Sequence, residues 1–336
     1  MTLLQRIRKG EDGILVIGNH HHILQSILDF DYSAGKALPS VVGIITSARK
    51  AQKLFFGSIE VLIPCYKNIS LVPAKVAKKV KWMLNIQSGR RALDSTIAFF
   101  DAYPDALGGH LFAENVPELH ATEIIRRYGK KYLIAGPSGV GLLVSRHLKL
   151  GAIGGVDISQ IEAAKLATKG SVAVISTSGG MTNEIIRAVV NAGKRVSFAM
   201  AIGGDRFPVT SLIDAFVLAE SDPETKSIVY FGELGGSDEY GIVQMIKEKK
   251  LTKPIICYIA GIIDEAFEEH MQFGHARALV ARQGESARAK REALSQVGAI
   301  AQETFRTFLE EIEKLPESAD FDTVTNIQAV TNRQKS

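Results

Sequence analysis

His275 is the residue of this sequence whose type and setting point most directly to chemistry, because a neutral imidazole is a good nucleophile at physiological pH. It lies in Gln-Phe-Gly-His-Ala at residues 272–276, downstream of two glycine-rich turns and of Glu233. An imidazole that carries a phosphoryl group needs backbone N–H donors around the dianion and a group that orients the ring. The set therefore predicts phosphoryl transfer through His275. A loop histidine that bonds to backbone is the alternative, and it leaves the other motifs without a role.

The first glycine-rich turn is Ser-Gly-Gly-Met at residues 178–181, between a strand-like apolar run and a helical pattern over 181–192. The first N–H groups of a helix have no partner inside it, and the helix dipole adds positive charge there. Such a terminus binds phosphate or carboxylate without a cationic side chain, and adjacent glycines let the anion come close. A plain strand–helix turn is the alternative. The second turn is Ile-Gly-Gly-Asp at residues 202–205.

Glu233 closes an apolar run and precedes Gly235 and Gly236, so its carboxylate is expected in the same crevice. A carboxylate beside His275 can accept one ring N–H, which fixes the tautomer and makes the other nitrogen more nucleophilic. A capping or surface acid is the alternative for Glu233. Glu114, at the predicted sheet edge of the first half of the chain, is a second candidate acid.

Length and composition favour a soluble globular protein of two domains. The chain has 336 residues, of which 46% are apolar and 23% are charged. Cys65 and Cys257 are isolated in apolar runs, which predicts core positions in a reducing compartment. We find no secretory signal and no apolar stretch near the ~20 residues of a membrane span, so we expect a cytoplasmic protein. A net charge of +4 without a basic stripe and interleaved aromatic residues argues against nucleic-acid binding.

Short apolar runs alternate with helical patterns along the chain, which is typical of parallel α/β architecture. Residues 1–150 are predicted to form a Rossmann-like sheet, and residues 151–170 to connect it to a second α/β unit. The runs of the second unit end in glycine-containing sequence, so we expect functional loops at the carboxyl edge of its sheet. Helices are predicted at 88–103 and within 285–315. The predicted strands are 14–17, 40–45, 61–65, 82–86, 108–113, 132–137, 171–176, 197–202, 227–231 and 254–259.

These motifs, in this order, resemble the α-subunit of the succinyl-CoA synthetase superfamily over about residues 14–310. Finer features are similar to the ATP-citrate lyases and citryl-CoA synthetases of that superfamily. The resemblance implies a Rossmann-like CoA-binding domain over 1–155, a flavodoxin-like parallel α/β ligase domain over 170–315 and a C-terminal tail over 316–336. The finer features are Leu-Asp-Phe-Asp-Tyr at 28–32, Glu-Val-Leu-Ile-Pro at 60–64, Asp-Ser-Thr at 94–96, Gly180, Asp-Arg-Phe-Pro at 205–208 and Gln-Phe-Gly at 272–274.

The resemblance implies a relay in which ATP phosphorylates His275, a carboxylate of citrate takes the phosphoryl group, and CoA thiolyses the acyl phosphate. Glu233 matches the carboxylate that holds this histidine. Arg277 replaces the glycine that usually follows Gly-His-Ala, and it could pair with phosphate, with a substrate carboxylate or with solvent. Glu114 is a further catalytic candidate. The residues expected to bind phosphate or the acid substrate are Ser178, Gly179, Gly180, Asn183 and Arg206.

The predicted CoA site departs from the family pattern. Succinyl-CoA synthetases carry a glycine-rich loop after the first strand, whereas Gly18 is followed here by Asn-His-His-His-Ile-Leu at 19–24. Bulkier residues keep the backbone away from a pyrophosphate, so we expect CoA contacts from side chains there. A metal site at the three histidines is disfavoured because neighbouring side chains point in different directions. The positions that match CoA contacts in the family are His21, His22, Ile23, Leu24, Lys50, Phe112, Ala113 and Glu114.

We find neither a nucleotide-grasping domain nor a citrate-synthase-like module in the sequence. The resemblance therefore implies an ATP-grasp β-type large subunit as partner, with Mg²⁺ bound beside its ATP, in a hetero-oligomer. Our hypothesis is the small subunit of a citryl-CoA synthetase, which ligates citrate and CoA and passes citryl-CoA to a separate lyase, as in a reductive citrate cycle. A ligase for succinate or another acid and a non-catalytic CoA-binding scaffold are the alternatives. A nicotinamide dehydrogenase is disfavoured because no G-x-G-x-x-G follows the first strand.

Overall fold

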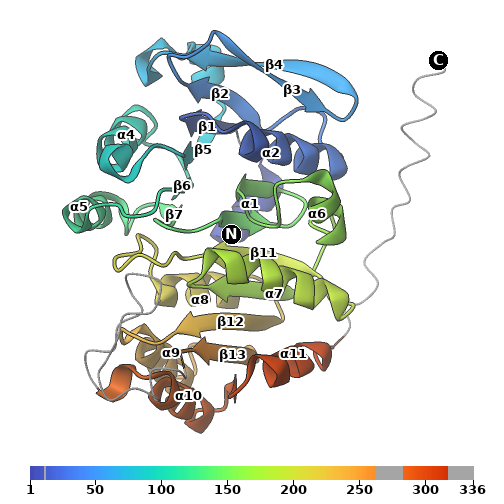
Figure 1. Cartoon of the computed structure of the whole chain (residues 1–336), viewed down its shortest axis with the longest axis vertical. Coiled ribbons are helices and arrows are strands. Elements are labelled where there is room, and N and C mark those ends of the chain that lie inside the picture. The colour runs from blue at the N-terminus through green and yellow to red at the C-terminus, as the bar shows by residue number, and fades with distance from the viewer. Residues whose placement is uncertain (11–12, 262–282, 317–336) are drawn as a thin grey trace, which may run out of the picture.

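Two seven-stranded sheets lie one above the other along the long axis of the molecule, and helices flank each of them (Figure 1). The computed structural model describes residues 1–10, 13–261 and 283–316. Both sheets are mostly parallel, so the predicted class of two successive α/β units is confirmed.

The first sheet has β1 at its centre, between β2 and β5. All five residues of β1 are buried, as expected for a parallel strand that is covered on both faces. β3 and β4, at one edge, pair antiparallel. Across the sheet the order is β3 (Ala51–Phe56), β4 (Ile59–Tyr66), β2 (Val41–Ile45), β1 (Gly13–Ile17), β5 (Val80–Asn85), β6 (Gly108–Leu111) and β7 (Leu133–Ala135). The helices of this part are α1 (Leu3–Lys9), α2 (His21–Ser33), η1 (Ile69–Leu71), α3 (Ala74–Ala77), α4 (Gly89–Ala102) and α5 (Glu118–Tyr128).

The second sheet has β10 at its centre, between β11 and β12, and all five residues of β10 are buried. The order across this sheet is β14 (Ile300–Gln302), β13 (Ile255–Ala260), β12 (Ser227–Glu233), β10 (Val172–Ser176), β11 (Val196–Ala201), β8 (Gly141–Val144) and β9 (Leu148–Gly151). The helices of this part are α6 (Ile158–Ala163), α7 (Gly179–Asn191), α8 (Leu212–Ser221), α9 (Asp238–Lys247), η3 (Gln283–Glu285), α10 (Ala287–Gln296) and α11 (Phe305–Glu313).

The hairpin of β8 and β9 is the main departure from the expected topology. It pairs antiparallel with β11 and so belongs to the second sheet, although the sequence predicts a first unit that extends to residue 155. Short apolar strands give no sign of which sheet they will join, because partner choice is a tertiary effect. Sheet membership changes before residue 141, and residues 158–163 of the expected connection form α6. The division into domains stays a prediction.

The N-terminal helix α1 joins the two halves of the molecule. Arg8 forms a bidentate pair with Asp222, which follows α8, with N···O distances of 2.5 and 2.9 Å. Burial disfavours the charge of Asp222, but hydrogen bonds from Arg8 and Thr225 hold its pKa below the ordinary value. Leu4 and Ile7 of the same helix lie in an apolar core that contains residues of both sheets. The two sheets are therefore packed as one body through a shared core.

Candidate functional site

The carboxyl edge of the second sheet brings three of the predicted site segments to one level. Ser176 of β10 lies opposite Ala201 of β11 on one side and Phe231 of β12 on the other. Ser178, Gly203 and Glu233 each lie two residues beyond that level; Ser178 and Gly203 follow their strands, and Glu233 is the last residue of β12. Since the three strands are adjacent and parallel, their ends form one crevice edge, which is where open α/β sheets bind ligands.

The start of α7 combines an N-cap without a side-chain hydrogen bond with space beside its first turn. Its N-cap residue Ser178 is buried and makes no side-chain cap hydrogen bond, and its N–H donates to Ser176 Oγ at 3.0 Å. Among residues 1–10, 13–261 and 283–316, a Cβ at Gly180 would meet no atom within 4 Å, whereas one at Gly179 would lie 3.0 Å from Val140 Cγ1. The first-turn N–H groups have no partner within the helix, so this terminus can accept a tetrahedral anion at Gly180.

The turn after β11 is packed so tightly that only glycine fits. Gly203 has φ +116°, and a Cβ there would lie 1.9 Å from the carbonyl oxygen of Pro137. The N–H of Gly204 donates to the carbonyl oxygen of Ser138 at 3.1 Å, and the N–H of Ser138 donates to that of Ala113 at 2.9 Å. Ala113 follows β6 of the first sheet, so these bonds tie the predicted CoA-binding segment to the predicted phosphate-binding turn.

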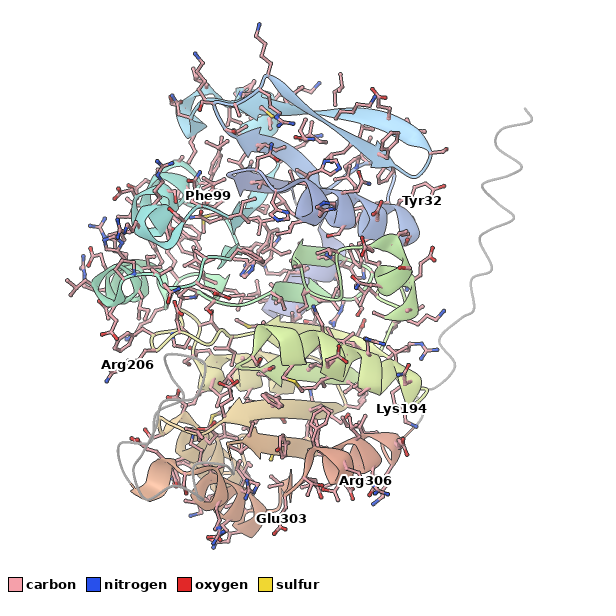
Figure 2. The ribbon with its side chains drawn as sticks, viewed as in Figure 1. Tyr32, Phe99, Lys194, Arg206, Glu303 and Arg306 are labelled. Carbon is pink, nitrogen blue, oxygen red and sulfur yellow. The ribbon has the colours of Figure 1, made fainter. Side chains whose placement is uncertain are left out.

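Arg206 lies at the molecular surface near α5 (Figure 2). Its Nη1 is 3.6 Å from Glu118 Oε1, and both side chains are more than 60% exposed. Its guanidinium carbon lies 5.6 Å from the centre of the Phe207 ring, which packs against a small apolar cluster that contains Val116. An exposed ion pair contributes about 0–1 kcal/mol, so a bound carboxylate could draw Arg206 away from Glu118 at little cost.

Asn183 is engaged with backbone rather than open to the crevice. Its Oδ1 accepts a hydrogen bond from the N–H of Gly154 at 2.7 Å, and its Nδ2 lies 3.5 Å from the carbonyl oxygen of Ala152. The amide of Asn183 therefore anchors the segment after β9 to α7. A contact with substrate, as the family resemblance implies, would have to use the remaining Nδ2 hydrogen.

Glu233 is the last residue of β12 and is half-buried, and the loop that follows it is held by a buried ammonium group. Lys290 Nζ donates to the carbonyl oxygens of Glu233 and Gly235 at 2.9 and 2.6 Å, and it lies 2.8 Å from Glu239 Oε2. Tyr230 donates to Glu239 Oε1 at 2.8 Å. Lys290 thus fixes the backbone that carries the predicted acid through two carbonyl oxygens, and Glu239 and Tyr230 hold Lys290 in place. The predicted nucleophile His275 lies outside the described residues, as does Arg277.

The start of α2 occupies the equivalent place in the first sheet and is built from side chains. His20 is the N-cap, and its Nδ1 accepts a hydrogen bond from the N–H of Ile23 at 3.5 Å. Of the four residues predicted to bind CoA here, His21 and His22 are exposed. Ile23 and Leu24 are buried in the core, so any contact of theirs with CoA is through backbone.

A polar cluster behind this helix start was not predicted from the sequence. The Oε1 of buried Gln52 accepts hydrogen bonds from Arg49 at 2.7 Å and from Asn19 at 3.1 Å. Its Nε2 lies 3.3 Å from the Nδ1 of His21. Arg49 is therefore held beside the exposed histidines, next to exposed Lys50. The cluster can supply a cation and several donors to an anionic ligand.

The end of β6 completes the rim of the first half. Phe112 and Ala113 are half-buried, and Glu114 is exposed. Buried His110, two residues before Phe112, has its Nδ1 3.1 Å from the carbonyl oxygen of Ala135. Burial lowers the pKa of His110 to about 4, so the ring is neutral at physiological pH.

This chain is similar to a family of CoA ligases and to ATP-citrate synthases. Residues 175–300 match the model of the CoA-ligase family. The chain carries a CoA-ligase domain. The chain is 36% identical over 304 residues to a probable ATP-citrate synthase subunit 1 from Schizosaccharomyces pombe, a match that covers 90% of this chain and 48% of that protein. It is 35% identical over 329 residues to the human ATP-citrate synthase, covering 97% of this chain and 29% of that protein.

A solved structure extends the likeness to the first sheet. An ATP citrate lyase variant from Methanosaeta concilii in complex with (3S)-citryl-CoA superposes with a TM-score of 0.86 and 31% identity, over 96% of this chain and 55% of that one. The resemblance predicted from the motifs is thus confirmed for the CoA-ligase domain and its ATP-citrate lyase relatives. The chain spans about half the length of the first relatives it matches, or less.

Two further features of the described residues concern metal ligands and membrane-spanning helices. Among residues 1–10, 13–261 and 283–316, no group of three or more His, Cys, Asp and Glu side chains is arranged to hold a metal ion. No helix in the described part of the chain is long and apolar enough to cross a membrane.

Proposed function

We propose that this chain is the α-type small subunit of a citryl-CoA synthetase, which converts citrate, CoA and ATP into citryl-CoA, ADP and phosphate. The observation that supports this most is that Ser178, Gly203 and Glu233 lie at the same level of the second sheet's carboxyl edge. Backbone hydrogen bonds through Ser138 connect the turn at Gly203 and Gly204 to the end of β6. Such an arrangement places an anion-binding terminus and an acid beside a candidate CoA-binding rim. We propose citrate as the acid because the relatives are named ATP-citrate synthase and ATP citrate lyase.

In this proposal His275 attacks the γ-phosphorus of ATP, a P–N bond forms, and ADP leaves. A citrate carboxylate oxygen then attacks phosphorus, the P–N bond breaks, and the imidazole is regenerated as citryl phosphate forms. The CoA thiolate attacks the acyl carbon and expels inorganic phosphate. Splitting the condensation in this way keeps the energy of each bond for the next step.

The residues of this chain have separate tasks in that sequence. The first turn of α7 at Gly179 and Gly180 binds the phosphoryl group, and Glu233 orients His275 by accepting a ring N–H. Arg206 binds a further carboxylate of citrate. The helix start at His21, with Lys50 and the rim at Phe112 to Glu114, binds CoA. ATP and Mg²⁺ bind an ATP-grasp β-type large subunit, and a separate lyase takes the citryl-CoA.

The experiment is an acyl-CoA assay on the complex of this chain with an ATP-grasp large subunit. We expect citryl-CoA from ATP, CoA and citrate, and its loss in His275→Asn. His147→Asn, in the turn between β8 and β9, is the matched control and should retain activity. Succinyl-CoA as the preferred product would change the proposed acid, and no acyl-CoA from any acid would leave a non-catalytic scaffold as the function.

A further inference from the structure

One chain of hydrogen bonds runs between the two helix starts of the proposed site. It begins in the first turn of α2, where the carbonyl oxygen of Ile23 accepts from Ser26 Oγ at 2.8 Å. Ser26 Oγ in turn accepts from Lys149 Nζ at 2.8 Å, although Lys149 belongs to β9 of the other sheet. The same Nζ donates to the carbonyl oxygen of Gly151 at 2.8 Å.

The second part of this chain of bonds reaches α7. The segment after Gly151 turns sharply at Gly154, which has φ +76°, and a Cβ there would lie 2.3 Å from Leu166 Cδ1. The N–H of Gly154 donates to Asn183 Oδ1 at 2.7 Å, one turn from the start of α7. The chain thus runs from α2 to Lys149, along a tightly packed backbone, and on to Asn183.

Lys149 is buried for its hydrogen bonds rather than to fill space in the core. Ser26 and Lys149 are both fully buried. Burial lowers the pKa of Lys149 to about 7, while the carboxylates of Asp31 and Asp29 oppose that shift. An apolar side chain of the same length would fill this space without the desolvation cost, but it could not bond to both Ser26 and Gly151.

We infer that Lys149 and Asn183 are positioning residues that hold the start of α2 at a fixed distance from the start of α7. This inference rests on the proposed function, in which CoA bound at α2 must reach an acyl phosphate formed beside α7. Neither residue needs to touch the reacting atoms for this role. Each half of the site keeps its own ligand contacts without Lys149, whereas the transfer between halves depends on the distance, and a shift of about 1 Å can slow a reaction a hundredfold.

The test uses Lys149→Met in the complete complex with the ATP-grasp subunit. Three quantities are measured: the Kd for CoA, the rate of phosphorylation by ATP, and the single-turnover rate at which citrate and CoA discharge the phosphorylated enzyme to citryl-CoA. We expect the first two to stay within about twofold of wild type and the third to fall at least about tenfold. Lys194→Met is the matched control, because Lys194 is also buried but follows the far end of α7 (Figure 2).

Two further variants separate positioning from folding. Ser26→Ala removes the bond to α2 but leaves Lys149 bonded to Gly151, so it should slow the discharge without loss of folded protein. If Lys149 and Asn183 act through one chain, Lys149→Met with Asn183→Ala should slow the discharge no more than the slower single variant. Multiplied effects would assign Asn183 a separate contact with substrate and overturn its part in the inference.

Discharge at the wild-type rate in Lys149→Met, or equal loss of all three quantities, would overturn the inference while leaving the proposed function intact. Failure of the wild-type complex to become phosphorylated would instead overturn the proposed function, and this inference with it.

Discussion

The starts of α2 and α7 occupy equivalent places in the two sheets, each directly after the central strand, but they are built differently. At α7 two glycines leave the first turn open, and the donors are backbone N–H groups. At α2 the side chain of His20 caps the first turn, and Gln52 holds Arg49 and His21 around it. The same topological position can therefore bind an anion through backbone in one half and through side chains in the other.

This difference has a physical consequence for substitution. A backbone site is destroyed by adding a methyl group and is insensitive to truncation of its neighbours. A side-chain site tolerates truncation in steps, and each lost hydrogen bond costs only about 0.5–1.5 kcal/mol. The predictions below test that contrast.

Gly203→Ala should give the largest effect, because it combines a positive φ with a Cβ 1.9 Å from Pro137 O. We expect a loss of about 4 kcal/mol in the free energy of unfolding, measured by denaturant titration. Gly193→Ala is the control: it has φ +77° and nothing within 4 Å, so it should cost about 1 kcal/mol. Equal costs for the two variants would show that the turn after β11 is not tightly packed.

Acid should destabilise the contact between the two sheets, where His110 of β6 lies buried and neutral beside Gly151 of β9. Its pKa is about 4 in the folded chain and about 6.5 when exposed, so the unfolded chain takes up the proton first as the pH falls. The free energy of unfolding should therefore fall between pH 6.5 and pH 4, by up to about 3 kcal/mol from this group. His110→Gln should flatten that slope in denaturant titrations across the range. An unchanged slope would mean that the ring is protonated in the fold.

Gly180→Ala should separate activity from stability at α7. The new Cβ meets no atom of the described residues within 4 Å, and alanine in a helix is more favourable than glycine by about 0.5–1 kcal/mol, so the melting temperature should not fall. The methyl group occupies the space of the anion, so citryl-CoA formation should drop at least about tenfold, or about 1.4 kcal/mol. Normal activity in this variant would place the anion elsewhere.

Arg49→Ala should give the smallest effect, at α2. It removes one cation and one hydrogen bond to Gln52, so the Kd for CoA should rise about fivefold, measured by calorimetry. The Kd of the variant should also depend less on ionic strength than that of wild type, because one cation is gone. His22→Ala removes an exposed ring that contacts the rings of His20 and His21 edge-on, and it leaves the bonds of Gln52 to Arg49 and Asn19 in place, so it should change the Kd less. A loss of CoA binding by a hundredfold or more in Arg49→Ala would contradict the stepwise character of this half.

The parallel strands could be predicted because buried strands carry continuous apolar runs, as in β1 and β10. The hairpin of β8 and β9 could not be assigned to a sheet, since its short runs encode no partner. Lys149 and Lys290 escaped prediction because a lysine in a sequence is ordinarily read as a surface residue, and only the fold shows that both are buried. Ile23 and Leu24 match family positions that contact CoA, but their side chains lie in the core. The position of His275 stays a prediction.

The most direct test is to identify the phosphorylated residue in the intact complex. After incubation with ATP at mildly alkaline pH, peptide mass spectrometry should find one phosphate on His275, and citrate with CoA should remove it as citryl-CoA appears. The absence of phosphate on the chain, phosphate on any other residue, or phosphate on His275 that citrate and CoA leave in place would contradict the proposed relay.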